Sequence, residues 1–278
     1  MATPTLDKQT LEGSLGDILV DVRTGERNTP RPAVLILHGF KGFKDWGMFP
    51  PLADRLAQAG LTAVSFNLSG SGADDRGDFS RLDLFRHNTY RRDLEDIDSV
   101  LSALIQGRLG VVAPTSIGLI GHSRGGGEAV LMGDDPRLGA IVTWSAIGTI
   151  RRWPDEEMDR WRTTGHLDVL NSRTGQVMTI GRDLLQEIDS DADGALSIEQ
   201  AAACIAVPWL ILHGSQDESV PLAEADMLHR AATRDDAVFQ VLDGAGHTFG
   251  ATHPLTGITP HMETAFERTV DWFSRFLT

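Results

Sequence analysis

Cysteine is almost absent from this chain of 278 residues, in which Cys204 is the only example. A single cysteine excludes a disulfide within the chain and a metal site built from several cysteines. The chain also lacks an uninterrupted run of about 18 apolar residues, the minimum for a helix that crosses a membrane. Its first residues, M-A-T-P-T-L-D-K-Q-T, lack the apolar centre of a signal peptide. We therefore expect a soluble, cytoplasmic protein without a membrane partner.

Basic residues are scarce relative to acidic ones. Lys and Arg together number 25 and Asp and Glu number 39, which gives a net charge of −14. Binding to a nucleic-acid backbone or to an anionic lipid surface depends on clustered Lys and Arg. This composition argues against a nucleic-acid partner. We expect a monomer or a homodimer that acts on a small molecule.

Apolar runs that alternate with segments of helical periodicity predict an α/β fold. Continuous apolar runs, which are typical of buried strands, occupy residues 33–37, 61–66, 117–120, 138–144, 207–212 and 237–242. Apolar residues at helical spacing predict helices over residues 49–59, 91–105 and 263–277. Short alternating segments within residues 1–30 predict an antiparallel hairpin at one edge. Together these patterns predict a mainly parallel, twisted sheet with helices on both faces.

One long segment interrupts this alternation. About 60 residues separate the strand that ends near Trp144 from the next predicted strand, which is far longer than a usual connection. Within the segment, 167–171 and 176–180 flank N-S-R-T-G and predict a hairpin, and 182–188 has helical spacing. We therefore expect a core domain formed by residues 1–146 and 206–278, with residues 147–205 inserted as a small cap.

The segment 116–131 carries the sequence G-H-S-R-G between a strand-like run and a helix-like run, with Ser123 at its centre. This G-x-S-x-G pattern places a serine on a very tight strand-to-helix turn that strains its backbone and exposes its hydroxyl. Gly121 and Gly125 flank the serine where we expect no room for a Cβ atom. The following helix directs its N-terminus at the serine and favours an anion there. A structural turn with an incidental serine is the alternative interpretation.

A serine hydroxyl needs a base to accept its proton, and the base needs an acid to orient it. Asp217 follows the predicted strand at 207–212, and His247 follows the last predicted strand. In a parallel sheet these strand ends meet at one edge, so we expect both side chains to converge on Ser123. We predict that His247 is the general base and Asp217 the orienting acid, with Glu218 as the alternative acid.

The oxyanion of a tetrahedral intermediate needs preorganised hydrogen-bond donors. We predict that the backbone N–H of Arg124, directly after the serine, is one donor. The second donor should lie on the loop after the strand at 33–37, where we select the N–H of Phe40. A simple tight exit from the strand is the alternative for this loop. Two further histidines near strand ends are expected to pack or to hydrogen-bond, namely His122 and His213.

These segments resemble the α/β-hydrolase superfamily across nearly the whole chain. Within it, H-G-F-K-G-F-K-D-W-G-M-F-P, F-N-L-S-G-S-G, G-H-S-R-G-G-G and H-G-S-Q-D-E-S-V-P are similar to bacterial dienelactone-hydrolase-like and cinnamoyl-esterase-like enzymes. The resemblance implies a Ser–His–Asp hydrolase that cleaves carboxylic esters, of the short-acyl or aryl (cinnamoyl) type, through an acyl-enzyme. It also implies that no metal or organic cofactor takes part and that the insertion forms a cap over the site.

The chain departs from this pattern in two places. Ser123 stands where dienelactone hydrolases proper have a cysteine, and the H-G-F loop lacks the H-G-G-G run of many lipases. Because fold and triad do not fix the acyl acceptor, a peptidase or an acyltransferase is an alternative. A non-catalytic ligand-binding protein on the same scaffold is a further alternative, which the three filled triad positions disfavour.

Four apolar residues of the insertion are candidates for an acyl or aryl pocket, namely Trp153, Met158, Trp161 and Met178. The same four could instead form the cap's own small core, and the sequence does not separate these interpretations.

Two motifs point to ligands that we do not expect. The run D-S-D-A-D-G, from Asp189 to Gly194, opens like a calcium loop, but Gln200 occupies the twelfth position where a bidentate Glu is needed. We interpret the run as a solvated acidic turn. The G-S-G at 70–72 follows a strand as in a dinucleotide site, but Asp75 replaces the third glycine.

Overall fold

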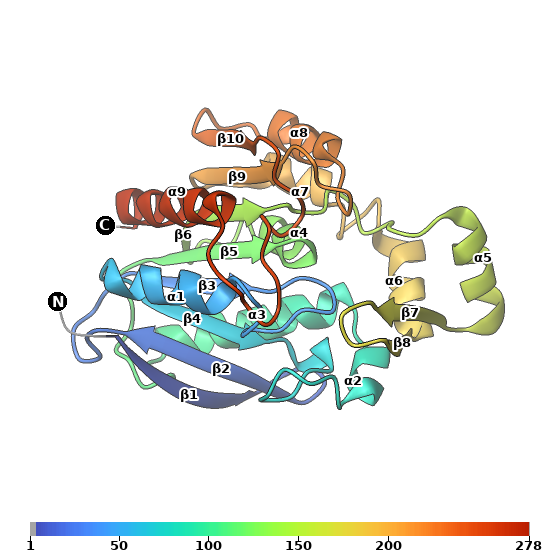
Figure 1. The fold of residues 1–278 in the computed structure, drawn as a ribbon, viewed down its shortest axis with the longest axis horizontal. Helices are drawn as coiled ribbons and strands as arrows, with labels where there is room; N and C mark the ends of the chain where they lie inside the picture. The colour runs from blue at the N-terminus through green and yellow to red at the C-terminus, as the bar shows by residue number, and fades with distance from the viewer. Residues whose placement is uncertain (1–3, 278) are drawn as a thin grey trace.

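A computed structural model, which describes residues 4–277, contains an eight-stranded sheet with helices on both faces (Figure 1). The strand order is β1-β2-β4-β3-β5-β6-β9-β10. The antiparallel pair β1 and β2 forms one edge, β2 pairs antiparallel with β4, and all later neighbours are parallel. The strands are β1 (Thr5–Glu12), β2 (Asp17–Thr24), β3 (Ala33–Leu37), β4 (Thr62–Asn67), β5 (Ile117–His122), β6 (Leu138–Trp144), β9 (Trp209–Gly214) and β10 (Ala237–Leu242). The predicted mainly parallel sheet with an antiparallel edge is confirmed.

The central strands are apolar without interruption because both faces of the sheet are covered. In β3, Val34 and Ile36 belong to the core on one face, whereas Leu35 and Leu37 belong to the core on the other. Successive side chains of a strand point to opposite faces, so each residue of β3 meets a helix layer. One layer contains α1 (Phe49–Gln58) and α9 (Pro260–Phe276), and the other contains α3 (Tyr90–Ile105), α4 (Arg124–Leu131) and α8 (Leu222–Ala231).

Local signals fix where two of the long helices begin. The Thr89 side chain accepts a hydrogen bond from the N–H of Arg92 at the start of α3. Thr259 does the same for Met262 at the start of α9, where Pro260 takes the first helical position. Two short helical turns lie between β4 and α3, namely η1 (Ser69–Ser71) and α2 (Leu82–Arg86). Among residues 4–277, no helix combines the length and the apolar character that a bilayer crossing requires.

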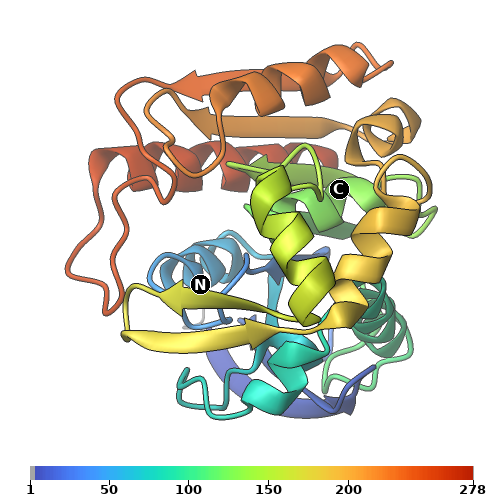
Figure 2. The same cartoon turned by 90° about the vertical axis from the view of Figure 1, so that its right-hand side faces the viewer.

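The predicted insertion 147–205 lies at one end of the sheet and is seen face on in Figure 2. Its elements are α5 (Asp155–Thr164), the antiparallel pair β7 (Leu167–Asn171) and β8 (Gln176–Ile180), α6 (Arg182–Asp191) and α7 (Ile198–Cys204). The hairpin occupies the predicted residues, and the helix after it begins at the predicted residue but continues to Asp191. The α7 helix packs against α4 and α8 of the core layer, although it lies inside the predicted insertion. The division into core and cap domains stays a prediction.

Candidate active site

Ser123 lies between β5 and α4 with φ 57° and ψ −118°, a backbone conformation that residues other than glycine rarely adopt. Three main-chain hydrogen bonds hold it there. Its N–H donates to the carbonyl of Trp144 at 2.9 Å, and its carbonyl accepts from the N–H groups of Gly127 and Ile147, both at 3.1 Å. The turn therefore stores strain that the neighbouring strand and helix stabilise.

The two glycines of the motif are required by close backbone contacts. A Cβ atom at Gly121 would lie 2.0 Å from the carbonyl oxygen of Gly125, and one at Gly125 would lie 2.4 Å from that of His38. Neither contact is tolerable without movement of the main chain. The expectation that no Cβ fits on either side of Ser123 is therefore met by the packing.

Asp217 and His247 form a hydrogen-bonded pair between the ends of β9 and β10. The Nδ1 atom of His247 lies 2.8 Å from Oδ2 and 3.1 Å from Oδ1 of Asp217, whose side chain is fully buried. The N–H groups of Ser219 and Val220 each donate to Oδ1 at 2.9 Å. Burial opposes ionisation, but these bonds and the His247 charge outweigh it and lower the pKa of Asp217 to about 2. The neighbouring Glu218 is exposed.

Ser123 and His247 line the same cavity, which has a volume of about 590 Å³. Within residues 4–277, the Ser123 hydroxyl and the His247 imidazole do not form a hydrogen bond. Nδ1 of His247 is held by Asp217, which leaves Nε2 as the nitrogen able to take a proton. Catalytic hydrogen bonds are often long in a ligand-free enzyme and shorten once substrate binds.

His122 and His213 lie beside the Asp217–His247 pair and hydrogen-bond to the main chain around it. His122 lies 4.7 Å from the His247 ring, centroid to centroid, and its Nε2 donates to the His247 carbonyl at 3.0 Å. Burial, followed by the charge of His247, lowers the pKa of His122 to about 3. Nε2 of His213 donates to the carbonyl of Val220 at 2.9 Å, and burial lowers its pKa. Both side chains hydrogen-bond to the main chain, as expected.

The two predicted oxyanion donors are free in the part of the chain that the structure describes. The backbone N–H groups of Phe40 and Arg124 have no protein acceptor there, and both residues border a second cavity of about 180 Å³ beside Ser123. The Phe40 loop is fixed by His38. Its Nδ1 donates to the carbonyl of Gly39 at 3.0 Å, and its Nε2 accepts from the N–H of Leu68 at 3.3 Å. Burial lowers the pKa of His38, which favours this neutral form.

The side chain of Arg124 is anchored in a buried cluster that the sequence did not reveal. It lies 2.6 Å from Asp93 and 2.9 Å from Glu128, and its guanidinium stacks 4.0 Å from the Tyr90 ring centroid. Burial, the largest single influence, would lower the pKa of Arg124, but Asp93, Tyr90 and Glu128 together outweigh it and raise that pKa. Burial, followed by the negative charge of Asp93, raises the pKa of Glu128 well above its ordinary value.

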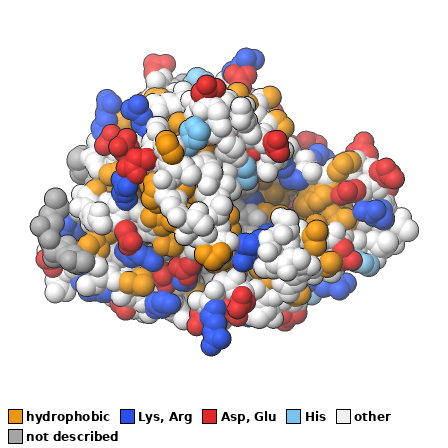
Figure 3. All heavy atoms as spheres, viewed as in Figure 1, with side chains coloured by type: hydrophobic (Ala, Val, Ile, Leu, Met, Phe, Trp, Pro, Cys, Tyr) orange, Lys and Arg blue, Asp and Glu red, His pale blue; other side chains and the backbone are white. Residues whose placement is uncertain are grey.

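The two cavities share Ser123 but differ in character. The larger cavity, visible as a hollow beside the cap in Figure 3, contains no carboxylate, although the chain is acidic overall. Its walls include Trp46, Phe49, Lys41, Arg173 and His253. The smaller one is lined by Tyr90, Ile147, Trp153, Arg152 and Val220. Lys41, Tyr90 and Arg173 carry no sequence signal, because only the fold brings them to Ser123.

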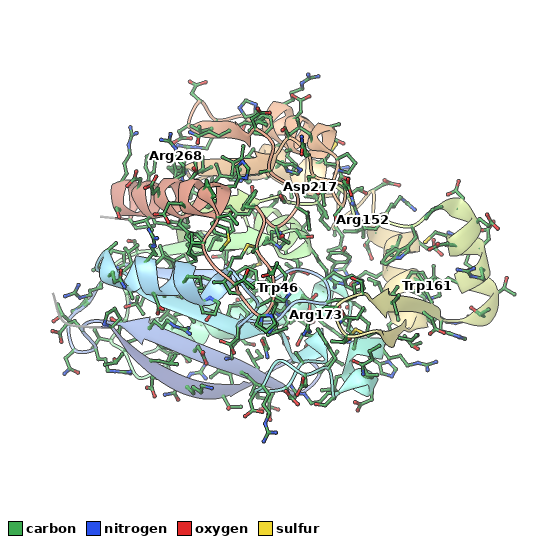
Figure 4. The ribbon with its side chains drawn as sticks, in the orientation of Figure 1. Trp46, Arg152, Trp161, Arg173, Asp217 and Arg268 are labelled. Carbon is green, nitrogen blue, oxygen red and sulfur yellow. The ribbon has the colours of Figure 1, made fainter. Side chains whose placement is uncertain are left out.

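The four candidate pocket residues separate into two groups. Trp153 lines the smaller cavity, whereas Met158, Trp161 and Met178 line neither cavity next to Ser123 and are buried in the apolar core that the cap shares with the helices. Trp161 contacts Trp153 edge to face, with 5.2 Å between ring centroids. In Figure 4, Trp46 and Arg173 lie close together at the cavity and Trp161 lies farther out, in the cap.

The second half of the acidic run, Ala192 to Gly194, is a turn as interpreted from the sequence, whereas its first half is helical, which corrects the interpretation there. Helix α6 continues to Asp191, so Asp189 and Asp191 lie on its last turn. The predicted helix stopped short because the aspartates break the apolar spacing. Each aspartate pairs with a different arginine: Asp189 with Arg162, Asp191 with Arg91 and Asp193 with Arg151. In the described chain no three His, Cys, Asp or Glu side chains are grouped to hold a metal. The G-S-G run lies in η1 and its cap, where Gly72 has φ 77°.

Comparison with known proteins gives a consistent picture. A profile described as Alpha/beta hydrolase family matches residues 34–258. The chain is 25% identical over 257 residues to 2,6-dihydropseudooxynicotine hydrolase of Paenarthrobacter nicotinovorans. The aligned region covers 91% of this chain and 60% of that protein. It therefore spans less than two thirds of the length of the curated relatives that it matches.

Solved structures agree at the level of the fold. Est1E from Butyrivibrio proteoclasticus with bound ferulic acid has a TM-score of 0.73 at 18% identity, covering 96% of this chain and 98% of that one. A dienelactone hydrolase from Anabaena variabilis has a TM-score of 0.64 at 15% identity, and the match covers 99% of this chain and 100% of that one. The predicted α/β-hydrolase fold is confirmed.

Proposed function

Because this chain belongs to the alpha/beta hydrolase family, we propose that it is a serine hydrolase that cleaves carboxylic esters through an acyl-enzyme. The observation that carries the proposal is the strained Ser123 in a cavity that it shares with the hydrogen-bonded Asp217–His247 pair. A residue in an unfavourable backbone conformation at a cavity wall is typical of a functional position.

The proposed reaction proceeds in two halves. Ser123 Oγ attacks the ester carbonyl while His247 Nε2 takes the hydroxyl proton, and the ionised Asp217 stabilises the resulting imidazolium. The N–H groups of Phe40 and Arg124 stabilise the oxyanion. Collapse of the intermediate breaks the C–O bond, and His247 returns its proton to the leaving alcohol. Water then repeats the sequence, which releases the acid and restores Ser123.

The position of His247, which must protonate the leaving alcohol, indicates which cavity holds the alcohol part of the substrate and which holds the acyl part. His247 lines the larger cavity only, so the leaving alcohol occupies that side, where the imidazole can protonate it. The acyl part then occupies the smaller cavity, beside Phe40 and Arg124. Lys41 and Arg173 on the alcohol side favour a polar or anionic alcohol. We propose a short-acyl or aryl ester, and bound ferulic acid in Est1E supports the aryl type.

Replacing Ser123 tests the proposal directly. We expect Ser123→Ala to lower kcat for 4-nitrophenyl butyrate by about 10⁴-fold or more, because the nucleophile is removed. Ser274→Ala, an exposed position on α9, is the matched control and should retain full activity. A fluorophosphonate probe should label the wild type and the control but not Ser123→Ala. Undiminished turnover by Ser123→Ala would refute the assignment.

The same proteins separate ester hydrolysis from the alternative uses of a triad. We expect turnover of the ester to exceed that of the matched 4-nitroanilide, and hydrolysis to exceed transfer to an added amine. Faster cleavage of the anilide would identify a peptidase, and dominant transfer to the amine would identify an acyltransferase.

A further inference from the structure

Tyr90, the only tyrosine in the chain, borders the smaller cavity together with Ser123. It is the first residue of α3 and is only 2% exposed. In the described part of the chain its hydroxyl has no hydrogen-bond partner. The hydroxyl nevertheless remains accessible to solvent, unlike the unpartnered polar atoms that are fully buried. The small exposed area of this residue therefore includes the hydroxyl, which opens onto the cavity.

The Tyr90 ring is held from two sides. The Arg124 guanidinium lies 4.0 Å from its centroid, and the backbone N–H of Tyr90 donates to Oε2 of Glu187 at 2.6 Å. Burial, despite the nearby Arg124 charge, raises the pKa of Tyr90, so its hydroxyl keeps its proton. The cation is attracted to the electron-rich face of the ring and helps to hold the ring in place. This is a fixed, protonated donor without a protein acceptor.

The remaining walls of the cavity offer little competition for a polar substrate atom. Ile147, Trp153 and Val220 are apolar, and Arg152 is already paired with Glu224 at 2.7 Å. Solvent can satisfy the hydroxyl while the cavity holds no substrate, but an acyl group that displaces the solvent without supplying an acceptor leaves the donor unpaired, which is unfavourable. An acyl group with an acceptor oxygen would supply one here, whereas a plain alkyl chain would leave the Tyr90 hydroxyl unpaired.

We infer that Tyr90 determines acyl specificity by donating a hydrogen bond to an acceptor oxygen, such as a keto or ether oxygen, on the acyl part of the substrate. This inference rests on the proposed function, since it places the acyl part away from His247. It predicts that esters of acids with such an oxygen are better substrates than esters of plain alkanoic acids.

The test compares wild type and Tyr90→Phe on three 4-nitrophenyl esters, the hexanoate, the 4-oxohexanoate and the 5-oxohexanoate. The phenylalanine keeps the ring stacked on Arg124, so only the hydroxyl is lost. For at least one keto ester we expect kcat/KM to fall about tenfold, against less than twofold for the hexanoate. For each ester, the kcat/KM of the variant is divided by that of the wild type, and this ratio cancels differences in the intrinsic reactivity of the esters.

Ser219→Ala is the matched control, because Ser219 also borders the cavity but is exposed and solvated. It should change all three ratios equally. An equal fall for every ester in Tyr90→Phe, or no fall for either keto ester, would overturn the inference while leaving the proposed function intact. A keto-ester effect in Ser219→Ala instead would also overturn it. If wild type turned over none of the esters and Ser123 stayed unlabelled by fluorophosphonate, the proposed function would fail, and the inference with it.

Discussion

The buried cluster around Arg124 predicts an unusual pattern of destabilisation when its two carboxylates are neutralised separately and together. Asp93 and Glu128 face one guanidinium, and their side chains are 2% and 0% exposed. The pKa of Glu128 is raised well above its ordinary value, and its Oε2 has no hydrogen-bond partner among the described residues. We therefore predict that Glu128 is protonated in the native state and shares its proton with Asp93. Two carboxyl groups thus carry one negative charge against one positive charge.

The magnitudes follow from where that charge resides. Glu128→Gln replaces a neutral acid by a neutral amide that can also donate to Asp93, so we expect a loss of less than about 1 kcal/mol. In Asp93→Asn, Glu128 can ionise and take over the pairing with Arg124, at a cost of about 1–2 kcal/mol. The double variant leaves the buried cation without an anion, which costs about 3–5 kcal/mol. The two changes should therefore destabilise more together than their sum.

Urea unfolding at pH 7, followed by tryptophan fluorescence, measures all four proteins. A loss in Glu128→Gln as large as that of the double variant would show that Glu128 is ionised in the native state, against this reasoning. Additive losses would show that neither carboxylate substitutes for the other. Because the Arg124 N–H is a proposed oxyanion donor, the double variant should also lose kcat by more than either single variant.

Two further predictions concern the triad and its support. Asp217→Asn should lower kcat for the ester by about 10⁴-fold, since the wrong imidazole tautomer is favoured. Glu218→Gln changes an exposed site, so its kcat for the ester should stay within about twofold of the wild-type value. His122, whose pKa is lowered to about 3, excludes a proton that the unfolded chain takes up near pH 6.5, so stability falls as the pH drops between these values. Between pH 7 and pH 5, the free energy of unfolding should therefore fall by about 2 kcal/mol less in His122→Gln than in wild type. Urea titrations at the two pH values measure both falls, and equal falls would contradict this origin.

The sheet could be predicted from the sequence because its physical constraints are local. Strands such as β3 and β5 are covered on both faces, so every position must be apolar and the run is visible in the sequence. The elbow at Ser123 was equally visible, because its close contacts demand glycine at fixed spacing. Polar residues directly after two later strands then identified Asp217 and His247 as a candidate pair.

Helices with few buried positions could not be predicted. In α5 only Met158 and Trp161 are buried, and in α8 only Ala225 and Leu228. Two buried residues do not produce a recognisable helical period. The α6 helix was predicted from its apolar residues, but its last turn carries Asp189 and Asp191, whose arginine partners come from α5 and α3. Partners distant in sequence stabilise a segment whose local pattern is that of a loop.

The substrate pocket was least accessible to sequence analysis because apolar residues of a cap have two possible uses. Trp153 and Trp161 pack against each other, yet only Trp153 reaches a cavity beside Ser123. The packing of α5 against α6 and β7 decides which ring faces which side, and no local pattern records it. The polar groups of the pocket are harder still to predict, since Tyr90 belongs to a helix of the core layer. Tyr90 is distant from Ser123 in sequence, but the side chain of Arg124, the residue next to Ser123, stacks on the Tyr90 ring. The residue that supplies the proposed oxyanion donor therefore also orients the proposed acyl contact.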